Sequence, residues 1–220
     1  MIGRSLMLAL CGTLVCAGVA FAGDNNTLYL TQTSDGPLGN SFYADQSHSV
    51  GNSITASQSG NGNVAHITTS DLCSSGLSAP CGGTVNLTQD NSSNQTGDAF
   101  TVDGQLARNY VSVTTSGNSS ATVSQLGDGN SATLNILDGS GNINQHGNDN
   151  TASLTVEDGT VGTITQNNDN NNAALTVTGV PGAAASLTQN GGNNYGPATV
   201  STPYAVNTPY AGLPVTITQY

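Results

Sequence analysis

Apolar and hydroxyl-bearing residues alternate along short stretches of this chain. Residues 151–156 read Thr-Ala-Ser-Leu-Thr-Val, so Ala152, Leu154 and Val156 occupy every second position. Because successive side chains of a β-strand point to opposite faces, this alternation predicts a strand with one apolar face. Gly and Asn recur too often for helices, and the apolar residues show no helical period. The pattern therefore favours an all-β fold.

One motif recurs along the chain: aliphatic-x-Gln-x-Gly-x-x-Asn-x-Ala-x-aliphatic-x-aliphatic. Residues 123–136 carry it in full. Nearly the same offsets follow four other glutamines, Gln58, Gln145, Gln166 and Gln189. Looser copies of the motif contain Gln32, Gln89 and Gln219. Separations of 20, 21 and 23 residues lie between the best-ordered glutamines, Gln125, Gln145, Gln166 and Gln189. A period of this length indicates a repeat of one short structural unit.

Each copy contains two strand-like segments joined by an arc rich in Gly, Asn and Asp, residues that tolerate positive φ. A single two-stranded unit is only marginally stable in water. Stacking about eight such units would bury their aliphatic residues in one continuous narrow core. We therefore predict an all-β fold, a parallel β-solenoid of stacked strand-arc-strand repeats.

The repeated amides are expected to point inward, where an unpaired amide would cost about 1–3 kcal/mol. Amides stacked about 4.8 Å apart can bond to the units above and below, which turns the cost into cohesion. An alternative is that they are ordinary polar turn residues, which explains the Asn positions but not the fixed Gln position. The predicted ladder and polymerisation residues are Gln32, Gln46, Gln58, Gln89, Gln125, Gln145, Gln166, Gln189, Gln219, Asn40, Asn63, Asn130, Asn150, Asn171 and Asn194.

Residues 1–22 have the features of a secretory signal peptide. Arg4 precedes an apolar stretch, and Ala20-Phe-Ala22 forms a small-residue cleavage site. No later run approaches the roughly 20 apolar residues of a membrane-spanning helix, so no transmembrane segment is expected in the mature chain. We assign 23–220 to the repeat domain, with an irregular insertion at 70–83 and a Pro-rich interruption at 195–214.

Two cysteines remain after the predicted cleavage, Cys73 and Cys81, within a Gly/Ser/Pro stretch. In an oxidising compartment this pair most simply closes a disulfide around a surface loop. A metal site is a poorer alternative, because two thiolates without a nearby His leave the coordination incomplete.

Charge narrows the choice of function. Only 7% of the residues are charged, and thirteen carboxylates face two cations, for a formal net charge of −11. Removal of Arg4 with the signal peptide leaves Arg108 alone against thirteen acids, a net charge of −12. We expect no nucleic-acid partner, since phosphate binding requires clustered Lys and Arg.

Catalytic and metal motifs are lacking in the sequence. It contains no Gly-x-Ser-x-Gly, no His-Glu-x-x-His and no phosphate-binding loop, and His48, His66 and His146 fall at outward or arc positions. The Gly-Gly-x-Gly-x-Asp nonapeptide of calcium-bound β-rolls is also missing. We expect neither an enzyme nor a cofactor.

The run Gln-x-Gly-x-Gly-Asn-x-Ala at 125–132 resembles the curlin repeat of bacterial curli fibres. That repeat also has a second Gln six residues after the Asn, matched here by Asn40 and Gln46. The resemblance is clear over 28–69 and 121–200. It implies a secreted subunit that polymerises at the bacterial cell surface into amyloid fibres of biofilm matrix. Its implied partners are further copies of itself, a nucleator subunit and an outer-membrane secretion pore.

The chain departs from the curlin pattern at the second glutamine, which survives only as Gln46. The equivalent residues are Thr69, Ile136, Val156 and Val177, so aliphatic packing is expected to replace one of the two amide ladders. The repeats also begin at Leu28, which leaves almost no separate segment for targeting to a pore.

The predicted function is that of an extracellular structural protein that polymerises into curli-like amyloid fibres, which support adhesion and biofilm matrix. The alternative is a monomeric secreted β-solenoid that binds polysaccharide or ice through Thr and Ser rows that include Thr163, Thr165 and Thr176. Asp128 and Asp169 occupy the same arc position, and their repulsion is expected to slow assembly at neutral pH.

Overall fold

A computed structural model describes the chain in ten ranges: 7–8, 17–22, 25–34, 36–48, 50–70, 82–91, 100–102, 105–179, 181–201 and 215–219. Within these ranges every regular element is a β-strand. Accordingly, the described residues include no helix long and apolar enough to span a membrane.

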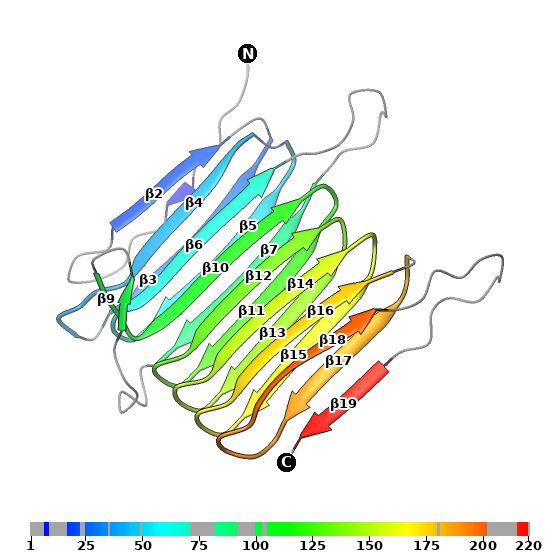
Figure 1. Cartoon of the computed structure of the whole chain (residues 1–220). Coiled ribbons are helices and arrows are strands. Elements are labelled where there is room, and N and C mark those ends of the chain that lie inside the picture. The colour runs from blue at the N-terminus through cyan, green and yellow to red at the C-terminus, as the bar shows by residue number, and fades with distance from the viewer. Residues whose placement is uncertain are drawn as a thin grey trace.

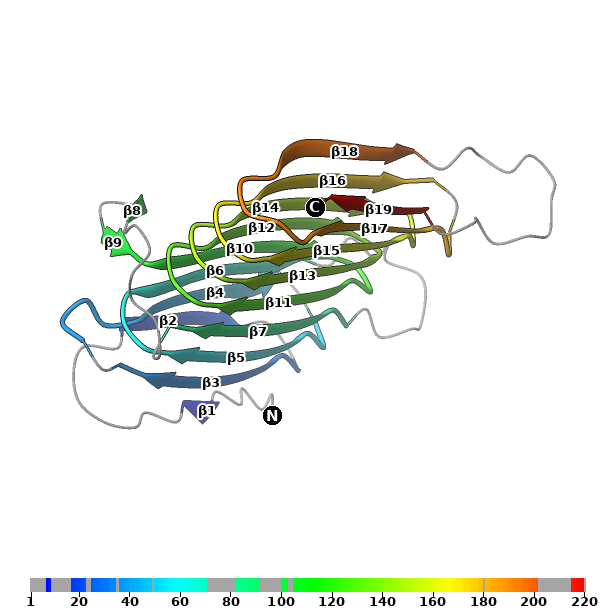
Figure 2. The same cartoon turned by 90° about the horizontal axis from the view of Figure 1, so that it is seen from below.

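Two parallel sheets lie face to face and form the body of the molecule (Figures 1 and 2). The first sheet has the order β1 (Met7–Leu8), β3 (Thr27–Thr33), β5 (Ser53–Ser59), β7 (Thr84–Asp90), β11 (Ser120–Leu126), β13 (Ser140–His146), β15 (Val161–Asn167), β17 (Ala184–Gln189) and β19 (Val215–Gln219). The second has the order β2 (Ala17–Ala22), β4 (Ser41–His48), β6 (Asn63–Ser70), β10 (Asn109–Ser116), β12 (Ser131–Leu137), β14 (Thr151–Glu157), β16 (Asn172–Thr178) and β18 (Tyr195–Ser201).

The chain alternates between the sheets, so each repeat contributes one strand to each and then advances by one place. Equivalent residues of successive repeats are register partners: Gln125 pairs with Gln145, and Gln145 with Gln166. In the second sheet Leu134 pairs with Leu154 in the same way. The predicted parallel β-solenoid is confirmed.

Aliphatic residues from the inner faces of both sheets form one continuous core. Ile143 and Ile164 of the first sheet and Leu154 and Leu175 of the second are at most 1% exposed. Their neighbours along each strand point outward, as the alternation predicts. The narrow core therefore runs along the stacking axis.

The repeat is more continuous than the sequence indicates. Residues 90–115 lack the regular offsets of the motif, but β10 takes a regular place between β6 and β12. Before it, β8 (Phe100–Val102) and β9 (Gln105–Ala107) form a small antiparallel pair. Part of the predicted 195–214 interruption is also regular, because residues 195–201 form β18. Pro197 lies in this strand at the edge of the second sheet, where a residue without an N–H is tolerated.

Several predictions fall wholly or partly outside the described residues. Cys73 and Cys81 lie there, with most of the insertion at 70–83 and residues 202–214. Of the predicted signal peptide, residues 7–8 and 17–22 are described as β1 and β2, which pair with β3 and β4. Cleavage after Ala22 remains a prediction, and it would uncover the edges of β3 and β4.

Candidate functional site

The glutamines of the first sheet form a hydrogen-bonded ladder along the core. In each step, the Nε2 group of one Gln donates to Oε1 of its register partner in the next repeat, over 2.5–2.9 Å. The ladder runs through Gln32, Gln58, Gln89, Gln125, Gln145, Gln166 and Gln189, all at most 4% exposed. Gln219 stands in register with Gln189.

Backbone carbonyls of the second sheet accept the remaining amide hydrogens of this ladder. Gln145 Nε2 also donates to the carbonyl oxygens of Ser131, at 2.9 Å, and Asn150, at 3.0 Å. Gln166 Nε2 bonds the carbonyl oxygen of Thr151 in the same way, at 2.9 Å. The ladder therefore ties the two sheets together as well as the repeats, and no interior amide is left with an unmet donor.

All six side-chain bonds of the glutamine ladder point in one direction, from the N-terminal repeat toward the C-terminal repeat. The ends of the stack are consequently different. Oε1 of Gln32, at the N-terminal end, is buried and has no hydrogen-bond partner. An unpaired buried acceptor is uncommon in folded proteins.

The asparagines form a second row, in which the expected bonds between side-chain amides occur at three steps. Nδ2 donates to Oδ1 of the preceding Asn from Asn63 to Asn40, from Asn109 to Asn63 and from Asn150 to Asn130, each at 3.1 Å. Oδ1 of one Asn accepts from the backbone N–H of the next Asn in the row, as in Asn150 to Asn130 at 3.1 Å and Asn171 to Asn150 at 3.0 Å. The side-chain NH₂ also donates to a carbonyl of the arc, as Asn130 does to Gly147 at 2.8 Å. The row comprises Asn40, Asn63, Asn109, Asn130, Asn150, Asn171 and Asn194.

Asn109 belongs to this row although sequence analysis did not select it. Its Nδ2 donates to Asn63 Oδ1 at 3.1 Å, and its Oδ1 accepts from the backbone of Asn130 at 3.0 Å. The motif does not identify Asn109, because Asn109 follows the preceding ladder glutamine, Gln89, by 20 residues, whereas Asn130 follows Gln125 by 5.

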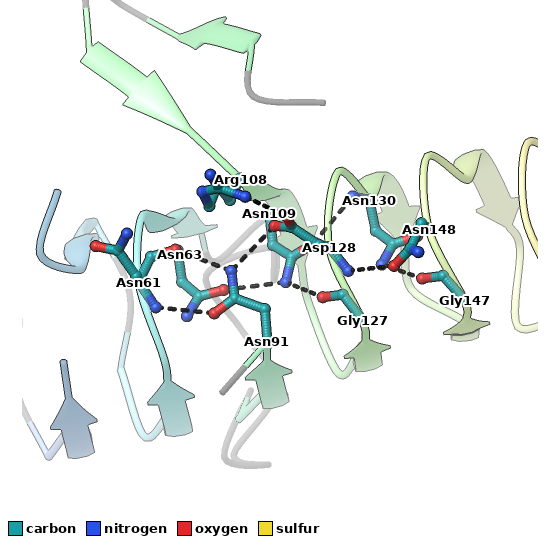
Figure 3. A network of polar contacts seen from close by, with 10 residues as sticks. All are labelled: Asn61, Asn63, Asn91, Arg108, Asn109, Gly127, Asp128, Asn130, Gly147 and Asn148. Carbon is teal, nitrogen blue, oxygen red and sulfur yellow. Dashed lines mark hydrogen bonds and ion pairs between the residues drawn. The ribbon is translucent and has the colours of Figure 1, made fainter. Parts of the chain in front are cut away.

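A third polar row lies in the arcs (Figure 3). The backbone N–H of Asn61 donates to Asn91 Oδ1, the N–H of Asp128 to Asn148 Oδ1, and the N–H of Asn148 to Asp169 Oδ1, over 2.7–3.0 Å. Asn91 Nδ2 donates to Asp128 Oδ1 at 3.2 Å, which connects the Asn61–Asn91 pair to the other three residues. We call these five residues the arc row.

Asp128 is fully buried in the arc row, and Arg108 forms an ion pair with it. Arg108 Nη1 donates to the carboxylate. The expected repulsion between Asp128 and Asp169 is therefore not supported. Asn148 separates the two residues, and the only cation of the predicted mature chain neutralises the first.

The position of the second curlin glutamine is buried in every repeat in which the structure describes its side chain. Gln46 and Thr69 occupy it at the N-terminal end, followed by Thr115, Ile136, Val156 and Val177. The described residues thus contain one continuous glutamine ladder, and aliphatic side chains fill the second position toward the C-terminus.

Outward-facing rows contain Thr, but these rows are mixed. One row of the first sheet has Thr122, Asn142, Thr163, Ser186 and Thr216 as successive register partners. On the second sheet, the rings of Tyr43, His66 and Tyr110 make edge contacts with centroids 5.8–5.9 Å apart. His146 is exposed.

No group of three or more His, Cys, Asp or Glu that could hold a metal ion occurs in the described ranges. Comparison of the chain with protein-family models, with curated proteins and with solved structures finds no match. We take the amide ladders and the edges at which they end as the candidate functional site.

Proposed function

We propose that this protein is an extracellular structural subunit that polymerises end to end into amyloid fibres, in the manner that its resemblance to curlin repeats implies. The continuous glutamine ladder carries the proposal. It stacks identical side chains in register, as amyloid fibrils do, and it ends in an unpaired acceptor at Gln32. A ladder that lacks a partner at its end favours addition of another copy.

The strand edges add to this argument. An edge strand presents unpaired backbone N–H and C=O groups, which natural proteins usually protect with Lys, Pro, bulges or a covering element. Both cations of the chain are Arg, so it has no Lys at all, and among the described edge strands only β18 contains a Pro, Pro197. Among the described residues the last strand of the first sheet, β19, is flanked only by β17. Removal of residues 1–22 would open the edges of β3 and β4 as well.

The partners follow from the same proposal. The partner of each subunit is another copy of this chain, and curlin-like assembly adds a nucleator subunit and an outer-membrane secretion pore. The fibre would lie at the bacterial cell surface and support adhesion and biofilm matrix. We propose no catalytic role and no cofactor.

Assembly of the purified protein without residues 1–22 tests the proposal. We expect fibres in electron micrographs, a fibre-diffraction reflection at about 4.7 Å along the axis, and a lag phase that preformed fibre fragments abolish. A protein that stays monomeric at high concentration with and without fragments refutes the proposal. Binding of that monomer to ice or polysaccharide would then identify it as a surface-binding solenoid.

A further inference from the structure

The two sheets do not end together at the C-terminal end of the stack. The first sheet continues past β17 to β19, whereas the second ends at β18 in the described part of the chain (Figure 2). Each earlier repeat, from β3 and β4 to β17 and β18, places one strand in each sheet. Strand β19 is therefore a half repeat, and it pairs with the edge of β17 that would otherwise be open.

Strand β19 resembles β3, the strand that an incoming copy would present. Residues 28–32 read Leu-Tyr-Leu-Thr-Gln and residues 215–219 read Val-Thr-Ile-Thr-Gln. Both place Gln opposite the Gln of the adjacent strand, as Gln219 to Gln189 and Gln32 to Gln58. The pairing of β19 is shorter, with five register pairs from Val215 to Gln219, against seven for β3 on β5.

The extra strand of the first sheet determines where the next copy can pair. If its β3 paired with β19, its β4 would lie two strand spacings from β18, about 9.6 Å, and the described strands would leave one place in the second sheet unfilled. If its β3 instead took the place of β19 on β17, its β4 would lie directly beside β18. Both sheets would then continue without a gap, and the core would stay closed.

We propose that β19 holds, within one molecule, the place that β3 of the next copy takes in the fibre. The inference rests on the proposed function and on removal of residues 1–22, which frees β3 and β4. Each addition displaces β19 from β17, so growth at this edge is a strand exchange between a short intramolecular strand and a longer intermolecular one.

The polarity of the ladders matches this exchange. Gln189 is the last fully described donor of the glutamine ladder, and Oε1 of Gln32 is the acceptor without a partner. In the proposed stack, Gln189 Nε2 donates to Gln32 of the next copy. Asn40 of that copy follows Asn194, as Asn194 follows Asn171 within one chain. Both rows then cross the junction in the same direction that they have inside the molecule.

A reversible lock tests the exchange. Thr188 and Thr218 are register partners on β17 and β19, so their Cα atoms lie about 4.8 Å apart, within the roughly 4.4–6.8 Å that a disulfide bridges. The variant Thr188→Cys with Thr218→Cys, oxidised as a monomer, should not elongate wild-type fibre fragments. Reducing agent should restore elongation to the wild-type rate.

The matched control locks two strands that need not separate. Thr165 and Thr188 are register partners on β15 and β17. The variant Thr165→Cys with Thr188→Cys should elongate fragments equally in the oxidised and reduced states. Elongation of the oxidised Thr188–Thr218 variant at the rate of this control would overturn the exchange while leaving fibre formation intact. Failure of the wild-type protein to form fibres would overturn the proposed function, and this inference with it.

A second measurement does not depend on the double variants folding. Copies with Thr31→Cys are mixed with copies that carry either Thr188→Cys or Thr218→Cys, assembled under reduction and then oxidised. Thr31 is exposed on β3, one residue before Gln32. Strand exchange predicts disulfide-linked dimers in the Thr188→Cys mixture. Dimers in the Thr218→Cys mixture alone would show that copies stack on β19 instead, which overturns the inference.

Discussion

Arg108 forms an ion pair with Asp128, whose side chain is fully buried, while the Arg108 side chain is 23% exposed. The pair fixes the irregular part of the chain to a regular arc, because Arg108 immediately precedes β10. Removing one partner of a buried ion pair leaves an uncompensated charge, which costs about 3–5 kcal/mol. Arg108→Leu should therefore lower the free energy of unfolding by about this amount in urea titrations of the monomer.

A compensating substitution tests the cause of that loss. Asn91 and Asn148 are neighbours of Asp128 in the arc row, so an amide fits this row. Adding Asp128→Asn to Arg108→Leu removes the buried charge and should recover most of the lost stability. A double variant as unstable as Arg108→Leu alone would show that packing of the Arg108 side chain, rather than its charge, stabilises the fold.

The glutamine ladder predicts strong coupling between neighbouring glutamines. Gln145→Leu leaves Gln166 Oε1 without its donor and costs about 1–3 kcal/mol. Gln166→Leu has the corresponding effect on Gln189. Together they remove both partners of the bond between them, so the double variant should lose less than the sum, by about 0.5–3 kcal/mol. Unfolding free energies of the four proteins of this double-mutant cycle measure the coupling.

Additive losses would contradict the ladder, because they would mean that each glutamine contributes only its own packing. Gln58→Leu combined with Gln166→Leu is the control. These residues are four ladder steps apart, with Gln89, Gln125 and Gln145 between them. Their losses should add.

The sequence was sufficient to predict the strands of the regular repeats and the glutamine ladder, because both follow from offsets along the chain. Alternation defines the inner face of each strand, and equal offsets place Gln125, Gln145 and Gln166 in register. The asparagine row was predicted only in part. The identity and spacing of Asn150 do not reveal that its Oδ1 accepts from a backbone N–H rather than from an amide side chain.

The arc row and the burial of Asp128 could not be predicted, because they depend on contacts between residues whose offsets vary. Arg108 lies in the irregular repeat, and no repeat position indicates that its side chain reaches the next arc. Asn91 is likewise separated from β10 by residues that no other repeat contains. Equal spacings between repeats predict which residues are register partners in a regular stack. An insertion changes the spacing, so the partners can no longer be predicted from it.

Arc glycines impose a further requirement on the stack. Gly147 has a φ of 117°, and a Cβ atom there would lie 2.4 Å from the carbonyl oxygen of Asn168 in the next repeat. A non-glycine residue in such a backbone region costs on the order of 1–3 kcal/mol, and the backbone contact adds to this. Gly147→Ala should therefore lower the urea midpoint of unfolding strongly.

Gly129 provides the matched control. Its φ is 72°, and a Cβ atom there would meet the carboxylate of Asp149, which can move. Asp149, Asn170 and Asn193 occupy the equivalent arc position with φ of 57–62°. Gly129→Asn should consequently be tolerated, because Asn adopts this left-handed conformation readily. Equal losses for the two substitutions would rule out the explanation from backbone geometry.

Charge should still slow assembly, although it does not act through Asp128. Each copy without residues 1–22 carries a net charge of −12, and Asp138, Asp158 and Asp169 are exposed. Like-charged copies repel one another, and the Debye length falls from about 30 Å at 0.01 M ionic strength to about 8 Å at 0.15 M. Seeded elongation should therefore accelerate across this range.

Sodium chloride and sodium sulfate at equal ionic strength should have the same effect if screening is the cause. A rate that sulfate raises much more than chloride would indicate strengthened apolar burial instead, since sulfate is excluded from protein surfaces. A rate that responds to neither salt would contradict any electrostatic barrier to addition.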